Sequence, residues 1–267
     1  MLRVIVTGAT GRMGARIIQL ISKTEGIELA GAVECQGHRL IGKDIGECQG
    51  IGKNGIIIDD SLERCIERGD VVIDFTFHEA SVNHLKIAAE HDKAIVIGST
   101  GFNDVEMQTI RELSKNTRCM VAPNMSVGVN VMLKVLESVA SILGDDYDVE
   151  LIEAHHNLKK DAPSGTAVKM AQVIASSLER NLDEVGVYCR KGIIGERKKK
   201  EIGIQTVRAG DIIGEHTVIF GGTGERLEFT HRAHSRDNFA TGAIRAALWI
   251  VKQKKGLYDM QDVLGLR

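Results

Sequence analysis

The sequence predicts an α/β protein in which a doubly wound parallel sheet is joined to a second, α+β domain with a mainly antiparallel or mixed sheet. Three observations predict this class. Short apolar runs alternate with segments of helical spacing through the first half of the 267-residue chain, as in βαβ units. A glycine-rich turn, Gly8–Gly14, joins the first predicted strand to the first helix. After about residue 185, strands follow one another with turn glycines and no helices between them.

The first βαβ unit has the pattern of a dinucleotide-binding site. An apolar strand over residues 2–7 runs into Gly8–Gly14, a helix follows over 15–22, and the strand Glu28–Val33 closes on Glu34. Glycines permit the tight turn and let backbone N–H groups approach a pyrophosphate, and an acidic residue at the second strand end suits ribose hydroxyls. The spacing is G-x-x-G-x-x-G, and an ordinary tight turn is the alternative. The strand–turn–helix context favours a Rossmann-like cofactor site.

Three later strands of this domain end in loops that suit a ligand. The loops are Asp74–Phe77, Gly98–Gly101 and Ala122–Met125. Ligands of open α/β sheets bind outside the carboxyl ends of the strands, so Gly98–Gly101 and Ala122–Met125 are expected to face the nicotinamide half of a dinucleotide, and Asp74–Phe77 also to line the cofactor. An ordinary helix cap and a strand stop are the alternatives for the first two loops. Residues 35–55 lack periodicity and predict a long loop around a minor strand. The remaining elements expected here are strand 70–75, helix 78–91, strand 93–98, helix 104–115 and strand 118–122.

The second domain is expected to hold a sheet packed on one or two helices. A helix over 238–254 then returns to the first domain. We therefore predict a dinucleotide-binding domain made of 1–126 and 237–267, and a substrate-binding and oligomerisation domain made of 127–236. The elements expected in the second domain are helix 126–143, strand 147–153, helix 164–179 and strands 185–190, 203–208, 211–220 and 225–231.

A strand-to-helix loop in the second domain, Glu153–Ala167, concentrates groups that hold anions or donate protons. His155, His156, Lys159, Lys160 and Asp161 fall within seven positions. The segment Ser164-Gly-Thr166 then offers hydroxyls and backbone N–H groups at a helix start, which suits an anionic ligand. A solvated loop with a serine cap is the alternative. The density of proton donors favours a catalytic site.

Composition is that of an ordinary globular protein. Hydrophobic residues make up 43% and charged residues 26%, and the net charge of −2 predicts no attraction to nucleic acid or to an anionic membrane. No apolar run is expected to span a bilayer, and no leader is expected before the first strand. The five cysteines are odd in number and never form a C-x-x-C pair, which argues against a disulfide framework or a zinc cluster. We expect a cytoplasmic protein.

Four motifs resemble one family of enzymes, the 4-hydroxy-tetrahydrodipicolinate (dihydrodipicolinate) reductases. They are V-x-G-A-x-G-R-M-G at Val6–Gly14, G-[ST]-T-G at Gly98–Gly101, A-P-N-x-S at Ala122–Ser126, and E-x-H-H-x-x-K-x-D-A-P-S-G-T-A at Glu153–Ala167. The resemblance runs along the whole chain in order and length. It implies a two-domain reductase, generally a homotetramer, that reduces a cyclic imine from 4-hydroxy-tetrahydrodipicolinate to tetrahydrodipicolinate in lysine and diaminopimelate biosynthesis.

The resemblance also implies roles for individual residues. His155 and Lys159 would be the proton-donating pair, and Arg236 lies where the family has an arginine before the last helix. The family commonly has an arginine where this chain has Cys35, and an aromatic residue where it has Met125. The residues implied for the substrate carboxylates are His156, Lys159, Ser164, Gly165 and Thr166. Those implied for the cofactor are Gly8, Ala9, Thr10, Gly11, Arg12, Met13, Glu34, Gly98, Ser99, Thr100, Ala122, Pro123, Asn124 and Met125.

The chemistry of the residues agrees with these roles. Hydride addition to a conjugated imine leaves an enamine-like anion, which a nearby histidine or lysine can protonate. A dicarboxylate substrate needs cations and N–H groups around it. Glu34 without an adjacent arginine favours NADH as cofactor, with NADPH also accepted.

Three other functions remain open from the residues alone. A related two-domain dehydrogenase acting on an amino acid or a sugar would share the first domain, and a nucleotide-sensing protein would bind the cofactor without turnover. A metal-dependent hydrolase could use His155, His156 and Asp161. Adjacent residues on an extended chain point to opposite sides, so the two histidines are poor co-ligands of one metal.

Overall fold

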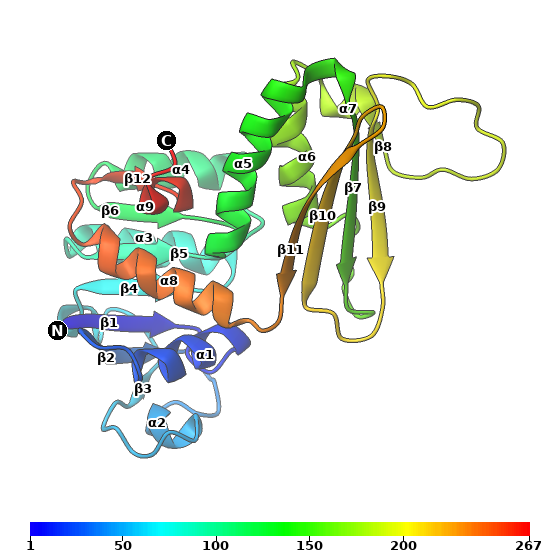
Figure 1. Ribbon diagram of the computed structural model, residues 1–267. Helices are drawn as coiled ribbons and strands as arrows, with labels where there is room; N and C mark the ends of the chain where they lie inside the picture. Colours follow the sequence, from blue (N-terminus) through cyan, green and yellow to red (C-terminus); the bar gives the residue numbers. More distant parts are fainter. The chain divides into compact units, whose positions relative to one another are not determined.

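The computed structural model describes all 267 residues, and the chain forms two compact units (Figure 1). Unit 1 consists of Met1–Val127 and Arg236–Arg267, and unit 2 consists of Gly128–Ser235. Each unit has its own sheet and its own apolar core. The predicted fold class, a Rossmann-like parallel sheet followed by an α+β unit, is confirmed.

Unit 1 is built on a seven-stranded, wholly parallel sheet in the order β12-β6-β5-β4-β1-β2-β3. The order reverses beside β1, which creates the crevice where ligands of doubly wound sheets bind. The strands are β1 (Leu2–Thr7), β2 (Ile27–Val33), β3 (Ile58–Asp59), β4 (Val71–Asp74), β5 (Ala94–Ile97), β6 (Arg118–Val121) and β12 (Gly256–Tyr258).

Helices cover both faces of this sheet, so its central strands are buried on both sides (Figure 1). Helices α1 and α8 pack on one face, and α3 and α4 pack on the other. This double burial explains why β4 and β5 read as continuous apolar runs. The helices of unit 1 are α1 (Arg12–Ile21), α2 (Ile45–Cys48), η1 (Ile66–Arg68), α3 (His78–Glu90), α4 (Asp104–Ser114), α8 (Asp237–Ile250) and α9 (Met260–Leu264).

Unit 2 has a five-stranded mixed sheet in the order β11-β10-β7-β9-β8. The pairs β7–β10 and β10–β11 are antiparallel, whereas β7–β9 and β8–β9 are parallel. Helices α5 and α6 supply apolar side chains to the single core of this unit. The elements are α5 (Val127–Leu143), η2 (Gly144–Asp146), β7 (Asp148–His155), α6 (Gly165–Ser177), α7 (Leu182–Val185), β8 (Gly186–Val187), β9 (Ile202–Arg208), β10 (Gly214–Gly221) and β11 (Arg226–Ala233).

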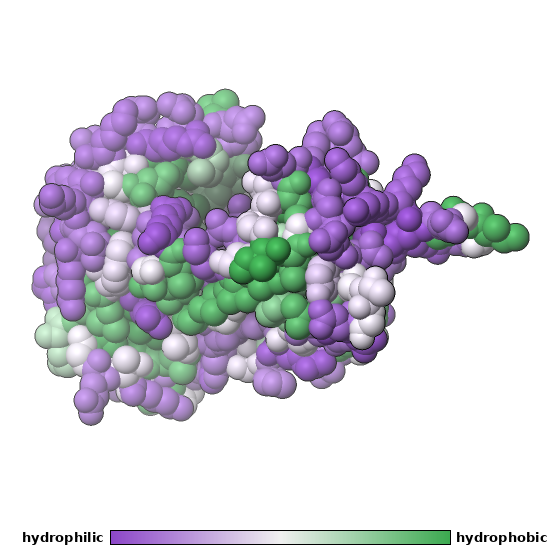
Figure 2. Space-filling model, turned by 45° about the horizontal axis from the view of Figure 1, so that its top comes forward, coloured by the Kyte–Doolittle hydropathy of each residue, from purple (hydrophilic) through white to green (hydrophobic).

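The loop between β8 and β9 stands away from the sheet of unit 2 (Figure 1), and its tip is apolar (Figure 2). Within it, Ile193 is 106% exposed and Ile194 is 55% exposed. The strand predicted over 185–190 is therefore wrong beyond Val187, because most of that segment belongs to this loop.

Several other predicted elements differ from the structure. The segment 35–55 contains the short helix α2, which Asp44 caps by accepting a hydrogen bond from the Glu47 N–H. The last helix ends at Ile250, and β12 and α9 follow it. These pieces are three to five residues long, too short for periodicity to detect.

The expectation that no apolar run could span a bilayer was wrong on length and composition. The segment Val127–Asp146 is long enough and apolar enough to cross a bilayer, with a mean hydropathy of 1.5. In unit 2, however, this segment contributes Val129, Met132, Leu136 and Ala140 to the core. Its exposed side carries an ion pair of 3.0 Å between Lys134 and Glu137. Both features are those of an amphipathic helix of a globular unit.

Candidate active site

The turn between β1 and α1 fits a bound pyrophosphate. Gly8 has a φ of +64°, and a Cβ at Gly14 would lie 2.1 Å from the Gly8 carbonyl oxygen. Only glycine permits this close approach of helix to strand. The N–H groups of Ala9, Thr10 and Gly11 already donate to Val33, Glu34 and Gly8. The N–H groups left to an anion are those of the first turn of α1, from Arg12 to Gly14, where no acidic residue stands.

Glu34 follows β2 at the same edge of the sheet. Its carboxylate accepts hydrogen bonds of 2.7 Å from both the N–H and the hydroxyl of Thr10. The Nε2 atom of His38 lies 3.5 Å from the same hydroxyl. The acidic residue is thus fixed beside the glycine-rich turn, where an adenosine ribose would lie in a Rossmann-like site.

A buried carboxylate, Asp74, organises the loops after β4 and β5. It accepts hydrogen bonds from the Thr76 N–H at 2.9 Å, the Thr76 hydroxyl at 2.7 Å and the Ser81 hydroxyl at 3.0 Å, and His84 Nδ1 lies 2.5 Å away. Burial raises its pKa, but the His84 and Thr76 bonds outweigh this and leave the pKa lowered. The Ser99 hydroxyl bonds Ser81 at 2.7 Å and the Thr76 carbonyl at 3.1 Å. Ser99 therefore offers a ligand its backbone rather than its hydroxyl.

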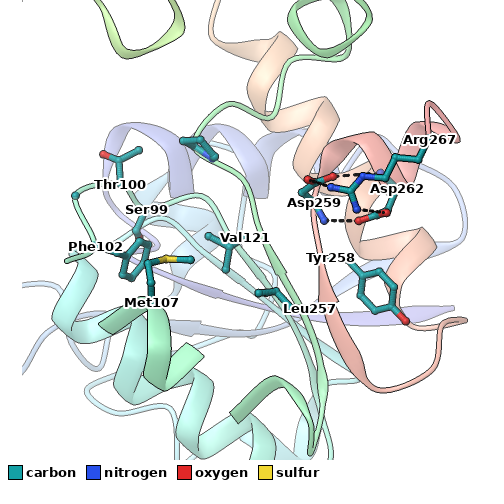
Figure 3. Close-up of a pocket in the computed structure, with 12 residues that line it drawn as sticks. Ser99, Thr100, Phe102, Met107, Val121, Leu257, Tyr258, Asp259, Asp262 and Arg267 are labelled. Atoms are coloured by element: carbon teal, nitrogen blue, oxygen red, sulfur yellow. Dashed lines mark hydrogen bonds and ion pairs between the residues drawn. The ribbon is translucent and has the colours of Figure 1, made fainter. Parts of the chain in front are cut away.

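A pocket of about 500 Å³ lies at the carboxyl ends of β5, β6 and β12 (Figure 3). Ser99, Thr100 and Pro123 contribute to its wall. On one side, Arg267 forms ion pairs with Asp259 at 2.5 Å and with Asp262 at 2.8 Å. Sequence reasoning missed this contribution of the C-terminus because β12 gave no signal of its own.

In the third predicted cofactor loop, Ala122–Met125, the first and last side chains point into the core of unit 1. Ala122 and Met125 are buried in the core of unit 1, so their side chains pack rather than point to a ligand. The Asn124 side chain accepts a hydrogen bond from the Ser126 N–H at 2.9 Å, which shapes the turn. Cofactor contacts at this loop would come from its backbone and from Pro123 and Asn124.

In unit 2, the loop that carries the predicted proton donors follows β7, at the end of the strand where its side chains change from apolar to polar. On the inner face, Val149 and Leu151 of β7 are buried in the core, and Glu153 and His155 continue the same side of the strand. His155 stands at the end of β7, and its side chain is 12% exposed. Its Nδ1 atom lies 2.6 Å from Glu153 Oε2, which leaves Nε2 as the outer ring nitrogen.

The lysine and the second histidine lie in the loop that follows. Lys159 is half-buried and forms an ion pair of 2.9 Å with Asp161. Nδ1 of His156 is buried and has no hydrogen-bond partner in the protein. These two residues supply polar N–H groups next to His155 along the chain.

The start of α6 completes the predicted anion site. Ser164 caps the helix by accepting a hydrogen bond of 3.2 Å from the Ala167 N–H. Its hydroxyl also lies 3.0 Å from Nε2 of His216. A Cβ at Gly165 would meet no atom within 4 Å, so the backbone there is open to a ligand. Thr166 lies in the first turn of the same helix.

The structure therefore groups the predicted residues within each unit. The residues predicted to bind cofactor lie on loops after β1, β2, β5 and β6, which all end at one edge of the parallel sheet. The predicted proton donors and carboxylate contacts lie between the end of β7 and the start of α6. In unit 1, sequence reasoning placed Asp74 in a ligand loop but missed that its buried carboxylate organises the neighbouring loops. It also missed Glu153, Thr206, Arg208 and His216 in unit 2, three of which lie on strands distant from the loop in sequence.

Together, the fold and the site define a nucleotide-dependent oxidoreductase made of a Rossmann-like unit and a substrate unit. Residues 2–125 match the family described as dihydrodipicolinate reductase, N-terminus, and residues 128–264 match dihydrodipicolinate reductase, C-terminus. The chain belongs to the dihydrodipicolinate reductase family.

Individual relatives agree with this assignment. The chain is 66% identical to the 4-hydroxy-tetrahydrodipicolinate reductase of Syntrophus aciditrophicus over the full length of both. Among solved structures, it resembles a dipicolinate-bound dihydrodipicolinate reductase from Paenisporosarcina sp. TG-14, with a TM-score of 0.77, 28% identity and coverage of 98% of each chain. An amine dehydrogenase from Mycobacterium smegmatis shares the fold alone, with a TM-score of 0.60 and 13% identity over 96% of this chain and 94% of its own.

Proposed function

We propose that the protein catalyses the NAD(P)H-dependent reduction of the cyclic imine derived from 4-hydroxy-tetrahydrodipicolinate to tetrahydrodipicolinate, in lysine and diaminopimelate biosynthesis. Family membership along both units supports this activity. The observation that carries the proposal is the arrangement of His155, Lys159 and the open start of α6 at the end of one strand. A related dehydrogenase acting on amino acids or sugars would share unit 1 but would not need this group of residues in unit 2.

The substrate is a small dicarboxylate. The relative from Paenisporosarcina binds dipicolinate, which carries two carboxylates on one ring. In this chain, the N–H groups of Gly165 and Thr166 at the start of α6 would bind one carboxylate, as helix N-termini do. His156 and Lys159 would bind through their side chains, and Ser164 would hold the helix start in place.

His155 and Lys159 are the proposed proton donors. A bound nicotinamide would supply the hydride to the conjugated imine. The enamine-like anion that is left needs one proton on carbon to complete the reduction. Burial lowers the pKa of His155, and the hydrogen bond with Glu153 opposes this effect, so the net pKa is lowered. A protonated His155 therefore gives up its proton readily, while Lys159 keeps N–H groups directed at the same substrate.

The cofactor is NADH in preference to NADPH. The fixed carboxylate of Glu34 can accept hydrogen bonds from the ribose hydroxyls of NADH. The 2′-phosphate of NADPH carries about two negative charges, which this carboxylate would repel. The cofactor residues would act through the backbone of the Gly8–Met13 turn and of the loops at Gly98–Thr100 and Ala122–Met125.

The remaining assignments follow the same proposal. Residues 1–126 with 237–267 form the dinucleotide-binding domain, and 127–236 form the substrate-binding and oligomerisation domain. The enzyme is a cytoplasmic homotetramer, with no metal, nucleic acid or membrane among its partners.

The first experiment follows loss of NADH absorbance with the dipicolinate intermediate as substrate. We expect His155→Ala and Lys159→Ala each to lower kcat by roughly 10²-fold or more, because each removes a proton donor. The KM for NADH stays the same, since neither residue lies in the nucleotide unit. His91→Ala, on an exposed histidine of unit 1, is the matched control. Turnover at the wild-type rate in either site variant would refute the role assigned to that residue.

A further inference from the structure

A buried carboxylate, Glu153, lies directly behind His155 and is part of no assignment made above. Its side chain is 0% exposed. It continues the row of Val149 and Leu151, so a carboxylate stands where the inner face of β7 would otherwise bury an apolar side chain. Burial of a charge is costly unless the charge is fully paired, so the position calls for an explanation.

The surrounding strands and helix saturate Glu153 with donors. Both terminal guanidinium nitrogens of Arg208, Nη1 and Nη2, donate at 2.8 Å, the Ser164 N–H donates at 3.0 Å and the Thr206 hydroxyl donates at 3.2 Å. Burial raises the pKa of Glu153, but the bonds from Arg208, His155 and Ser164 outweigh it and lower the pKa to about 2. Glu153 is thus an ionised acceptor, with no proton of its own to give.

This saturation decides which ring nitrogen of His155 carries a proton. Because Glu153 only accepts, the 2.6 Å contact requires that His155 donate from Nδ1. In the neutral ring, the outer nitrogen Nε2 then holds the lone pair. When the ring is protonated, Nε2–H is the proton that can leave.

The ring is also held from the side. A Cβ at Gly214 of β10 would lie 3.1 Å from Nε2 of His155, so glycine leaves just enough room for the ring. The His216 ring meets it edge-on with centroids 5.3 Å apart. Arg208 further donates to the Asp161 carbonyl at 2.7 Å and so fastens the end of the loop that carries Lys159.

We infer that Glu153, clamped by Arg208, is a positioning residue that fixes the ring orientation and the Nδ1 proton of His155 and stabilises its protonated form. The inference rests on the proposed catalytic role of His155. The charged and titratable groups around this ring are Glu153 on its own strand, Arg208 on β9, His216 on β10 and Lys159 in the following loop.

The decisive experiment is a double-mutant cycle of Glu153→Gln and His155→Ala. Alone, Glu153→Gln should lower kcat by at least about 10-fold and leave the KM for NADH unchanged. In the His155→Ala background, it should change kcat by less than about 2-fold, because Glu153 then has nothing to position. The inference would be overturned if Glu153→Gln lowered kcat by the same factor with and without His155. A wild-type kcat in Glu153→Gln would also overturn it.

The pH profile separates positioning from a structural role. Loss of the carboxylate removes stabilisation of the imidazolium, so the high-pH limb of kcat/KM should move to lower pH in Glu153→Gln. Arg208→Lys keeps the charge but loses the paired donors, and should give a smaller loss in the same direction. A variant that loses activity equally at every pH, with its profile unmoved, would assign Glu153 a structural role only.

Glu150→Gln is the matched control on the same strand. Glu150 lies on the opposite face of β7 and accepts two hydrogen bonds from Arg190, at 2.7 and 2.8 Å. Its replacement removes an equivalent carboxylate–arginine clamp without touching His155, so the pH profile should stay in place. A shift in this control equal to that of Glu153→Gln would contradict a specific effect.

A measurement on the wild-type enzyme does not depend on the folding of any variant. In protein labelled with ¹⁵N-histidine, the neutral His155 ring should show a protonated Nδ1 and an unprotonated Nε2, with His155→Ala identifying its signals. The opposite tautomer would overturn the inference. The proposed function fails separately: it falls if the wild-type enzyme does not oxidise NADH with the dipicolinate intermediate, whatever the tautomer.

Discussion

At the scale of single residues, cofactor choice depends on what stands beside Glu34. Its carboxylate is fixed by Thr10, and the next residue, Cys35, is exposed and uncharged. A 2′-phosphate near this carboxylate would cost ~1 kcal/mol or more for each of its charges. Arg12, Arg39 and Lys43 are exposed and can soften the repulsion, so preference rather than exclusion is expected.

Cys35→Arg should therefore shift the enzyme toward NADPH. An arginine there can grip the phosphate with two donors, and we expect the ratio of kcat/KM for NADPH over NADH to rise by about 10-fold. The ratio is measured at fixed substrate and fixed salt, because salt screens exposed charges. Cys35→Ser should leave it unchanged. A native enzyme that already prefers NADPH would mean that Arg12, Arg39 or Lys43 binds the phosphate.

The site residues of unit 2 that could be predicted from the sequence are those that lie in one continuous segment. His155, Lys159 and Ser164 lie within ten positions, so the chemistry of their loop was visible. Arg208 and His216 approach the same site only because β9 and β10 pair with β7 in one register, which places Thr206 and His216 opposite Glu153. That register depends on which strands become neighbours, and a local pattern does not contain it.

At the scale of elements, the strong periodic segments were predicted and the short ones were not. Helix α3 and strand β5 differ from the predicted bounds by a residue or so at each end, because apolar spacing over a full element is distinctive. Strand β12 has three residues and depends on pairing with β6 for its existence. The contribution of β12 to the pocket of Figure 3 could therefore not be predicted from the sequence.

The contact between α8 and the Ala122–Met125 loop gives a test at this scale. A Cβ at Gly242 of α8 would lie 1.8 Å from the Met125 carbonyl oxygen, so Gly242→Ala must push the helix and the loop apart. We expect a loss of about 1–3 kcal/mol in the free energy of unfolding and a raised KM for NADH, with the KM for substrate little changed. Thermal unfolding and steady-state kinetics measure both effects. Gly221→Ala, which meets no atom within 4 Å, is the control; equal effects in the two variants would contradict the close contact as the cause.

At the scale of the whole molecule, unit 2 has apolar surface that its own helices do not cover. Helices α5 and α6 contribute to the core on the inner face of the sheet. On the outer face, Ile152 of β7 is 39% exposed and Val207 of β9 is 42% exposed. The loop with Ile193 and Ile194 adds a further apolar tip (Figure 2). Exposed sheet faces and edges of this kind are commonly covered by another chain.

This surface supports a closed symmetric oligomer, because a self-complementary face is covered by the same face of a second copy. The proposed homotetramer needs a second such face as well, which the other exposed apolar residues of unit 2 could provide. Light scattering at micromolar concentration should give four times the mass of one chain. Val207→Glu, alone or with Ile152→Glu, should shift the mass to smaller species, because a charge buried between sheets is left unpaired. Ile142→Glu, which places the same charge on an 82% exposed position of α5, should not change it. A wild-type mass equal to one chain would refute the tetramer, and a tetramer that persists in the Val207 variants would move the interface to another face of unit 2.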